Sequence, residues 1–384
     1  MSGVGSTEPP RSGGAGSAGA GGGSSDFKPG LEGVVAFETE IAEPDREGGA
    51  LRYRGVDIEE LVGSYRFEQV WGLLVDESFS PGLPAAEPYE GGGLTGNTPA
   101  DLQAVTARLG AEWGVKKLID IDDDEAREDL LRLSAQFISI AAQSARIADG
   151  HDDRIAPQAV AQGATTAERF FLEWRGEADP SHVQALDTYW ICTCEHGLNA
   201  STFVARITAS TGSDCAAALS SAVGALSGPL HGGAPARVLP MLDAAAESGD
   251  PAAYVQSLIE RGERLMGFGH RVYRAEDPRA RLLKKTAKEL GAPRYEVADR
   301  LEAAALEALR KKSPDRPLET NVEFWSAVVL DVAGIPPELA PAMFACSRTA
   351  GWSAHILEQK KLSRLVRPSA RYVGPGARSA SSIG

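Results

Sequence analysis

Apolar and polar positions alternate along only one stretch of this chain, between residues 33 and 53. Val35 and Phe37 precede the turn-like sequence EPDREGGA, and Leu51 and Tyr53 follow it. Such alternation is typical of strands with one buried face, and a turn-rich sequence between two such runs favours a hairpin. The pattern therefore predicts a short β hairpin near the N-terminus.

From residue 57 onward the strand pattern nearly vanishes, and helical patterns replace it. No segment repeats at a fixed period, which argues against a solenoid. The chain is therefore predicted to be all-α, with the hairpin as a minor β element. The predicted helices cover residues 57–76, 99–113, 123–148, 165–175, 182–208, 214–227, 251–265, 278–291, 294–312, 321–333 and 337–358.

Composition narrows the class of protein further. The chain has 384 residues, of which 43% are hydrophobic, and a formal net charge of -14. Such an acidic chain is a poor candidate for binding nucleic acid or an anionic membrane. It can still bind a small anion, because a local group of arginines matters more there than the total charge.

Three features of the chain bear on its location in the cell. Residues 1–25 are rich in Gly, Ser, Ala and Pro without an apolar core, so they predict a disordered tail and not a signal peptide. The uncharged run 215–236 is interrupted by Gly228-Pro229, which favours a buried helix leading into a loop over a membrane span. Four scattered cysteines do not suggest a disulfide framework. We therefore expect a cytoplasmic protein with reduced thiols and no membrane contact.

Cys192, Cys194 and His196 lie close enough in sequence to raise the question of a metal site. If the segment is helical, Cys192 and His196 share a face while Cys194 points away. A second pair of ligands does not follow nearby in the sequence, so no metal is expected.

Three short motifs carry the candidate chemistry. His231 lies in GPLHGGA, His270 in MGFGHRVYR and Glu323 in ETNVEFW. Glycine allows a close approach of backbone and ligand, so a histidine between glycines can lie beside a substrate. Two histidines and one carboxylate can polarise a carbonyl, take up a proton and stabilise an enolate.

These motifs resemble those of the citrate synthase family, and the resemblance runs from about residue 33 to the C-terminus. It implies that uncharged His231 donates a hydrogen bond to the thioester carbonyl of acetyl-CoA. It also implies that His270 polarises the oxaloacetate carbonyl and that Glu323 removes the acetyl proton. The family normally has Asp at the position of Glu323, which is one methylene shorter.

The resemblance also implies the substrate-binding residues. His196, Arg279, Arg348 and Arg367 correspond to oxaloacetate ligands, and Arg367 to the one that a neighbouring subunit contributes, so a homodimer is expected. The loop of Leu265, Met266, Gly267, Phe268 and Gly269 corresponds to the site of the CoA adenine, and Arg274 to a contact with a CoA phosphate.

The expected activity is condensation of acetyl-CoA with oxaloacetate and water to citrate and CoA, without a metal or redox cofactor. Two alternatives stay open: a 2-methylcitrate synthase that uses propionyl-CoA, and a non-catalytic paralogue that binds acyl-CoA or oxaloacetate. The resemblance further implies a large helical domain formed by 26–232 and 332–384, with a small helical domain, 233–331, inserted into it.

Overall fold

The structure is a computed structural model that describes residues 27–45, 47, 49–229, 231–232, 237–269, 276–312 and 318–383. The chain divides into two compact units, Met1–Glu38 and Thr39–Gly384. The described part of the first unit contains the short 3-10 helix η1 (Pro29–Leu31). The tail predicted for 1–25 lies outside the described residues.

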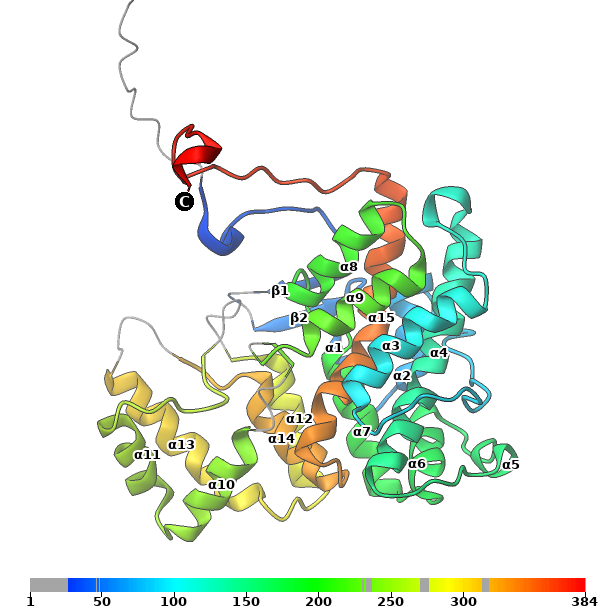
Figure 1. Cartoon of the computed structure of the whole chain (residues 1–384). Coiled ribbons are helices and arrows are strands. Elements are labelled where there is room, and N and C mark those ends of the chain that lie inside the picture. The colour runs from blue at the N-terminus through cyan, green and yellow to red at the C-terminus, as the bar shows by residue number, and fades with distance from the viewer. Residues whose placement is uncertain are drawn as a thin grey trace, which may run out of the picture. The chain divides into compact units, whose positions relative to one another are not determined.

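The second unit is built mainly of helices, which confirms the predicted all-α class (Figure 1). Its elements in chain order are β1 (Ala42–Asp45), β2 (Ala50–Tyr53), β3 (Val56–Asp57), α1 (Ile58–Leu61), α2 (Phe67–Asp76), α3 (Thr98–Glu112), η2 (Leu118–Asp120), α4 (Asp123–Ala148), α5 (Pro157–Val160), α6 (Thr166–Arg175), α7 (Pro180–Thr193), α8 (Ala200–Ser210), α9 (Cys215–Leu226), α10 (Val238–Glu247), α11 (Pro251–Glu260), α12 (Pro278–Glu289), α13 (Tyr295–Lys312), α14 (Val322–Val332), η4 (Pro337–Leu339), α15 (Ala340–Leu362) and η5 (Ala380–Ser382).

The β element is a small antiparallel sheet with the strand order β1-β2-β3. Ala42 pairs with Tyr53, and Arg52 pairs with Asp57. The predicted hairpin was therefore wrong in its bounds, because the first strand begins nine residues later than residue 33. Val35 is 87% exposed, so the early alternation has no buried face to support a strand.

Two predicted helices are interrupted. The segment 57–76 contains α1 and α2, and the segment 182–208 contains α7 and α8. Helix α7 ends at Thr193, and Gly197 in the segment before α8 has a φ of 61°, a left-handed conformation that a continuous α-helix does not contain. Asn199 then caps α8 by accepting a hydrogen bond from the backbone N of Thr202 (3.1 Å). Helices α5 and α10 were not predicted.

Helix α15 lies inside the helical body and packs against α2, α4, α7 and α8 (Figure 1). Most of its residues between Ala340 and Leu357 are buried, on every side of the helix. The indole N–H of Trp190 in α7 donates to the carbonyl oxygen of Met343 (3.1 Å), which fixes the two helices against each other. A helix buried all round holds a polar side chain in a fixed place.

A second group of helices packs against α7. Helices α12 and α14 pack against each other and against α7, while α10, α11 and α13 form a neighbouring cluster (Figure 1). This packing brings the first turns of α12 and α14 toward the C-terminal end of α7. The predicted division into 26–232 with 332–384 and 233–331 stays a prediction.

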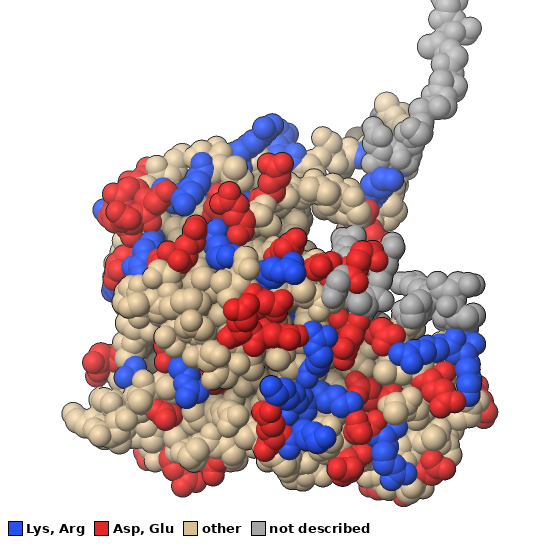
Figure 2. Space-filling view, turned by 180° about the vertical axis from the view of Figure 1, so that it is seen from behind, with Lys and Arg blue, Asp and Glu red and all other residues tan. Residues whose placement is uncertain are grey.

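Charged side chains of both signs are interleaved over the face shown in Figure 2. Within the described ranges, no helix is long and apolar enough to cross a membrane.

Candidate active site

A cavity of about 140 Å³ lies where α7, α8, α12, α14 and α15 meet. It brings together five residues that the sequence singled out: His196, His231, Arg279, Glu323 and Arg348. The other lining residues are Tyr189, Thr193, Asn199, Val322, Ser326 and Phe344.

His196 lies in the short segment between α7 and α8, and it is buried. Its neighbour Glu195 accepts a hydrogen bond from the Tyr53 hydroxyl at its backbone oxygen (3.1 Å). Tyr53 belongs to β2 and is fully buried, so the small sheet holds this segment in place. The break in the predicted helix is therefore what presents His196 to the cavity.

His231 lies close to the first turn of α8. Its Nε2 is 2.9 Å from the hydroxyl of Ser201, which is also 2.9 Å from Asn199 Oδ1. Burial, helped by the charge of Arg348, lowers the pKa of His231 to about 4. The ring is therefore neutral at pH 7. The Ser201 hydroxyl donates its one proton to Asn199 Oδ1, so Nε2 of the neutral His231 ring carries a proton and donates to Ser201 Oγ. His231 is therefore an uncharged hydrogen-bond donor through Nε2.

Arg348 is on the cavity-facing side of α15 and is buried. Its Nε donates to the carbonyl oxygen of Thr193 (3.0 Å), and its guanidinium lies 4.7 Å from the ring centroid of Phe344. These contacts fix the orientation of the guanidinium, and no described carboxylate forms a direct ion pair with it. A fixed, desolvated guanidinium is well suited to bind a carboxylate.

Arg279 is in the first turn of α12 and is held by Asp277. The Asp277 carboxylate accepts from Arg279 Nε (3.0 Å) and Nη2 (2.8 Å), and both side chains are buried. The same carboxylate accepts from the backbone N of Val322 (3.1 Å), the first residue of α14. One aspartate thus joins Arg279 to the helix that carries Glu323.

Glu323 is in the first turn of α14, where Asn321 caps the helix by accepting from the Glu323 backbone N (3.0 Å). Burial raises the pKa of Glu323 above its ordinary value, and the positive charges of Arg264 and Arg279 limit that rise. A carboxylate with a raised pKa is a stronger base than one in water. Glu323 is therefore equipped to accept a proton inside the cavity.

The loop before His270 is attached directly to the start of α14. Asn321 donates from its backbone N to Gly267 O (2.9 Å) and from its side chain to Gly269 O (3.0 Å). Gly267 has a φ of 84°, and a Cβ there would come within 2.7 Å of Phe324 Cβ. Glycine is therefore required at position 267, both for the turn and for the close packing on α14.

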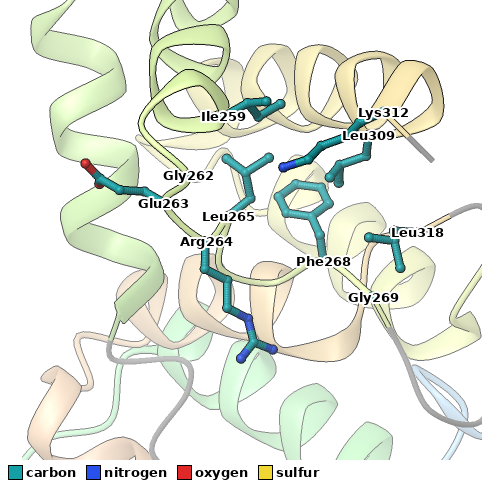
Figure 3. Close-up of a pocket in the computed structure, with 10 residues that line it drawn as sticks. All are labelled: Ile259, Gly262, Glu263, Arg264, Leu265, Phe268, Gly269, Leu309, Lys312 and Leu318. Carbon is teal, nitrogen blue, oxygen red and sulfur yellow. The ribbon is translucent and has the colours of Figure 1, made fainter.

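A second cavity, of about 490 Å³, adjoins this loop. Figure 3 shows Leu265, Phe268 and the amino group of Lys312 directed into it. Of the five loop residues predicted to bind CoA, Leu265, Phe268 and Gly269 line this cavity, and Met266 and Gly267 do not.

Three further predicted site residues are His270, Arg274 and Arg367. His270 and Arg274 lie outside the described residues. Arg367 is exposed in the segment that follows α15. Ser201 and Asp277 were not predicted as site residues, although Asp277 lies only two positions before Arg279 in the sequence. In the parts that the structure describes, no group of three or more His, Cys, Asp or Glu could hold a metal ion.

The chain is similar in sequence to one family model and to several known proteins. The family model "Citrate synthase, C-terminal domain" matches residues 30–90 and 95–369. The "Putative citrate synthase 2" of Mycobacterium tuberculosis is 59% identical over 360 residues, which is 93% of this chain and 96% of that protein. The citrate synthase of Haloferax volcanii is 36% identical, over 91% of this chain and 97% of that protein.

A solved structure agrees with the sequence matches. It is the ternary complex of carboxymethyl coenzyme A and oxaloacetate with citrate synthase from the thermophilic archaeon Thermoplasma acidophilum. It superposes with a TM-score of 0.79 at 28% identity, over 93% of this chain and 98% of that one. On the family match and the close relatives, the chain belongs to the citrate synthase family.

Proposed function

We propose that this chain condenses acetyl-CoA with oxaloacetate and water to give citrate and free CoA. The observation that carries the proposal is the first cavity, which combines a base, Glu323, a neutral histidine, His231, and two buried arginines. This set suits removal of a proton next to a carbonyl in the presence of a dicarboxylate. The relatives named citrate synthase support the same activity.

Oxaloacetate binds through its two carboxylates. Arg348 and Arg279 offer guanidinium groups at the cavity wall, and His196 adds a ring nitrogen. By resemblance to the family, His270 polarises the keto group, and Arg367 of a second subunit is a further ligand of the oxaloacetate carboxylates. The active form is then a homodimer.

Condensation begins when the Glu323 carboxylate accepts a proton from the methyl group of acetyl-CoA. His231 donates a hydrogen bond to the thioester oxygen, where negative charge develops. The methyl carbon then forms a bond to the keto carbon of oxaloacetate, and the keto oxygen takes up a proton. Water finally cleaves the thioester and releases the CoA thiol. These steps require no metal and no redox cofactor.

The 490 Å³ cavity beside Leu265 and Phe268 suits the adenine end of CoA, because it offers apolar side chains with Lys312 at its edge. Arg274 is proposed to contact a phosphate. The expected cytoplasmic location fits four free, buried cysteines.

The test is a spectrophotometric assay of thiol release with acetyl-CoA, with propionyl-CoA, and with either thioester alone. We expect release that requires oxaloacetate and is faster with acetyl-CoA. Faster release with propionyl-CoA would identify a 2-methylcitrate synthase, the name of a relative in Shewanella oneidensis that is 32% identical. An absence of release with both thioesters would favour a non-catalytic paralogue.

The cavity of about 140 Å³ leaves little room for a second substrate until the site rearranges. We therefore propose that oxaloacetate binds first and that segment 233–331 closes over it, creating the acetyl-CoA site and excluding water. Calorimetry should show tighter acetyl-CoA binding when a non-reactive oxaloacetate analogue is present. Equal affinity with and without the analogue would contradict this order.

A further inference from the structure

The two arginines of the cavity differ in how their charges are balanced. Arg279 has the Asp277 carboxylate in direct bidentate contact. Among the residues that the structure describes, Arg348 has no direct ion pair, and its Nη1 has no hydrogen-bond partner. A buried guanidinium without a contacting anion needs compensation from a charge that lies farther away.

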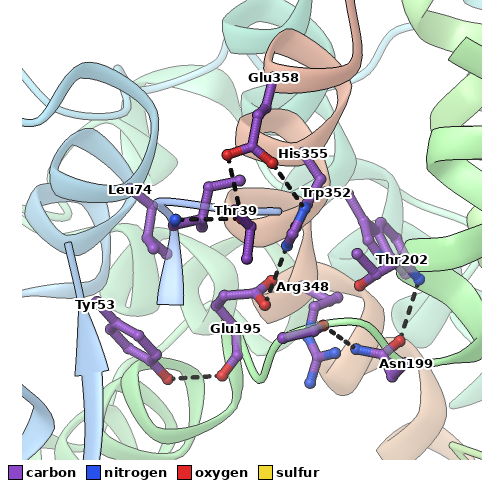
Figure 4. A network of polar contacts seen from close by, with 12 residues as sticks. Thr39, Tyr53, Leu74, Glu195, Asn199, Thr202, Arg348, Trp352, His355 and Glu358 are labelled. Atoms are coloured by element: carbon purple, nitrogen blue, oxygen red, sulfur yellow. Dashed lines mark hydrogen bonds and ion pairs between the residues drawn. The ribbon is translucent and has the colours of Figure 1, made fainter. Parts of the chain in front are cut away.

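That charge is Glu195, the residue before His196. Its side chain is fully buried, and Figure 4 shows it beside Arg348, between Tyr53 and His355. Burial acts to raise the pKa of Glu195, but His355 and Arg348 outweigh burial and hold the pKa below its ordinary value. Glu195 is therefore an ionised carboxylate in the wall behind the anion-binding arginine.

The hydrogen bonds around Glu195 keep its charge in place. His355 Nδ1 is 2.9 Å from Arg206 Nη1, and arginine can only donate, so Nδ1 is the acceptor. The ring proton is then on Nε2, which donates to Glu195 Oε1 (3.3 Å). Arg206 is held in turn by Glu358 and by Gln359 Oε1 (3.1 Å from its Nε).

Helix α15 leaves space for this carboxylate. A Cβ built at Gly351 would lie 2.1 Å from Glu195 Oε2 and 2.6 Å from the carbonyl oxygen of Cys194. The Oε2 atom has no hydrogen-bond partner in the described part of the chain, so no neighbouring donor there depends on it. The fold thus places a negative charge next to the site without using it for a direct contact.

We propose that Glu195 is a built-in counter-ion that weakens the binding of carboxylates at Arg348 and so promotes release of the product. The proposal rests on the proposed function. Citrate carries one more carboxylate than oxaloacetate, so a fixed negative charge nearby repels citrate more strongly. At an effective dielectric constant of about 20, two charges separated by several ångströms change an equilibrium by tenfold or more.

The experiment measures the dissociation constants of oxaloacetate and citrate by calorimetry on the full chain. Glu195→Gln keeps the shape of the side chain and removes its charge. We expect it to bind oxaloacetate about tenfold more tightly than the unmodified protein, and to tighten citrate binding by a larger factor. Unchanged or weaker binding of both would overturn the proposal, as would an equal gain for the two ligands.

Glu173→Gln is the matched control, because Glu173 is also a buried glutamate, held by Ser139 and Gln143 away from this cavity. It should leave both dissociation constants within about twofold. If Glu195→Gln does not fold, His355→Phe serves instead, since a buried carboxylate that loses its donor takes up a proton. For each ligand, the affinity of the variant is compared with that of the unmodified protein. A larger gain for citrate than for oxaloacetate supports the proposal, and a loss of affinity overturns it.

The unmodified protein separates this inference from the proposed function. If it neither binds oxaloacetate nor releases thiol, both are wrong. If it does both and Glu195→Gln shows no gain in affinity, only the role of Glu195 is wrong.

Discussion

The two walls of the cavity are built differently. The core wall is formed by Thr193 in α7, His196 in the segment after α7, and Arg348 in α15, a helix that is buried on all sides. The loop wall, formed by Arg279 and Glu323, stands on the first turns of two helices. Asp277 joins those two turns by accepting from the Arg279 guanidinium and from the backbone N of Val322.

Under the proposed function, the core wall binds oxaloacetate, while the loop wall holds both Arg279, a further proposed ligand, and the proposed base. The core wall is fixed by close packing, which resists displacement and suits the recognition of a substrate. The loop wall carries the base and depends on a few polar contacts, so a small change there can move the reacting group. A displacement of about 1 Å can cost roughly 10²-fold in rate.

The sharpest test of this difference is Glu323→Gln, which removes the base and keeps its size. We expect the turnover number to fall by about 10³-fold, because general bases typically contribute 10²–10⁴-fold. Oxaloacetate affinity should stay within about twofold, since the core wall is intact. Steady-state thiol release and calorimetry measure the two effects.

Two further variants are compared with Glu323→Gln. Glu319→Gln, which removes a carboxylate paired with Arg310, should leave both quantities unchanged. Glu323→Asp should keep substantial activity, because the base is retained, or increase it if the longer side chain is a compromise. Near-normal turnover by Glu323→Gln would return the non-catalytic paralogue to consideration.

Arg348→Gln tests the core wall. It removes a buried guanidinium that is fixed by Thr193 and Phe344, so the dissociation constant of oxaloacetate should rise by about 10²-fold. The control is Arg281→Gln, since Arg281 is exposed and pairs with Glu276 (3.2 Å). A turnover defect at saturating oxaloacetate, with unchanged affinity, would show that the two walls are not separate in function.

Asp277→Asn probes the connection between Arg279 and α14. The amide cannot accept from both neighbours as the carboxylate does, so affinity for oxaloacetate and turnover should each fall by about tenfold. Asp250→Asn is the matched control, because Asp250 caps α11 in the same way. An effect on affinity alone would show that Asp277 acts on Arg279 and not on the position of Glu323.

The smallest expected effect is the change of rate between pH 8 and pH 6. The pKa of Glu323 is raised, so the fraction of ionised base, and with it kcat/KM, falls as pH decreases toward that pKa. His231 remains neutral until about pH 4 and does not contribute to this decline. The residual activity of Glu323→Gln should lack the acid limb, and a matching limb in that variant would assign it to another group.

The sequence was informative where local signals are strong. The motifs around His231 and Glu323 lie far apart in the chain, yet the structure brings both to one cavity with Arg279 and Arg348. The single helix predicted over 182–208 was wrong, because α7 ends at Thr193 and α8 begins only at Ala200. Asn199, a good cap, could have indicated the break.

Other features could not be obtained from the sequence. The role of Asp277 depends on α14 reaching the start of α12, a contact between residues 45 apart. Glu195 and His355 are 160 residues apart, so their pairing follows only from the packing of α15. Arg367 is exposed in this chain, and its predicted role requires a second copy.

Gly351 has a consequence for the genetics of this protein. A Cβ at position 351 would overlap with Glu195 Oε2. Codon 351 should therefore encode only glycine in a library selected for activity. Codon 92 makes a useful contrast, because a Cβ at Gly92 meets nothing within 4 Å. Variation should therefore be permitted at the surface glycine and absent at the one inside α15.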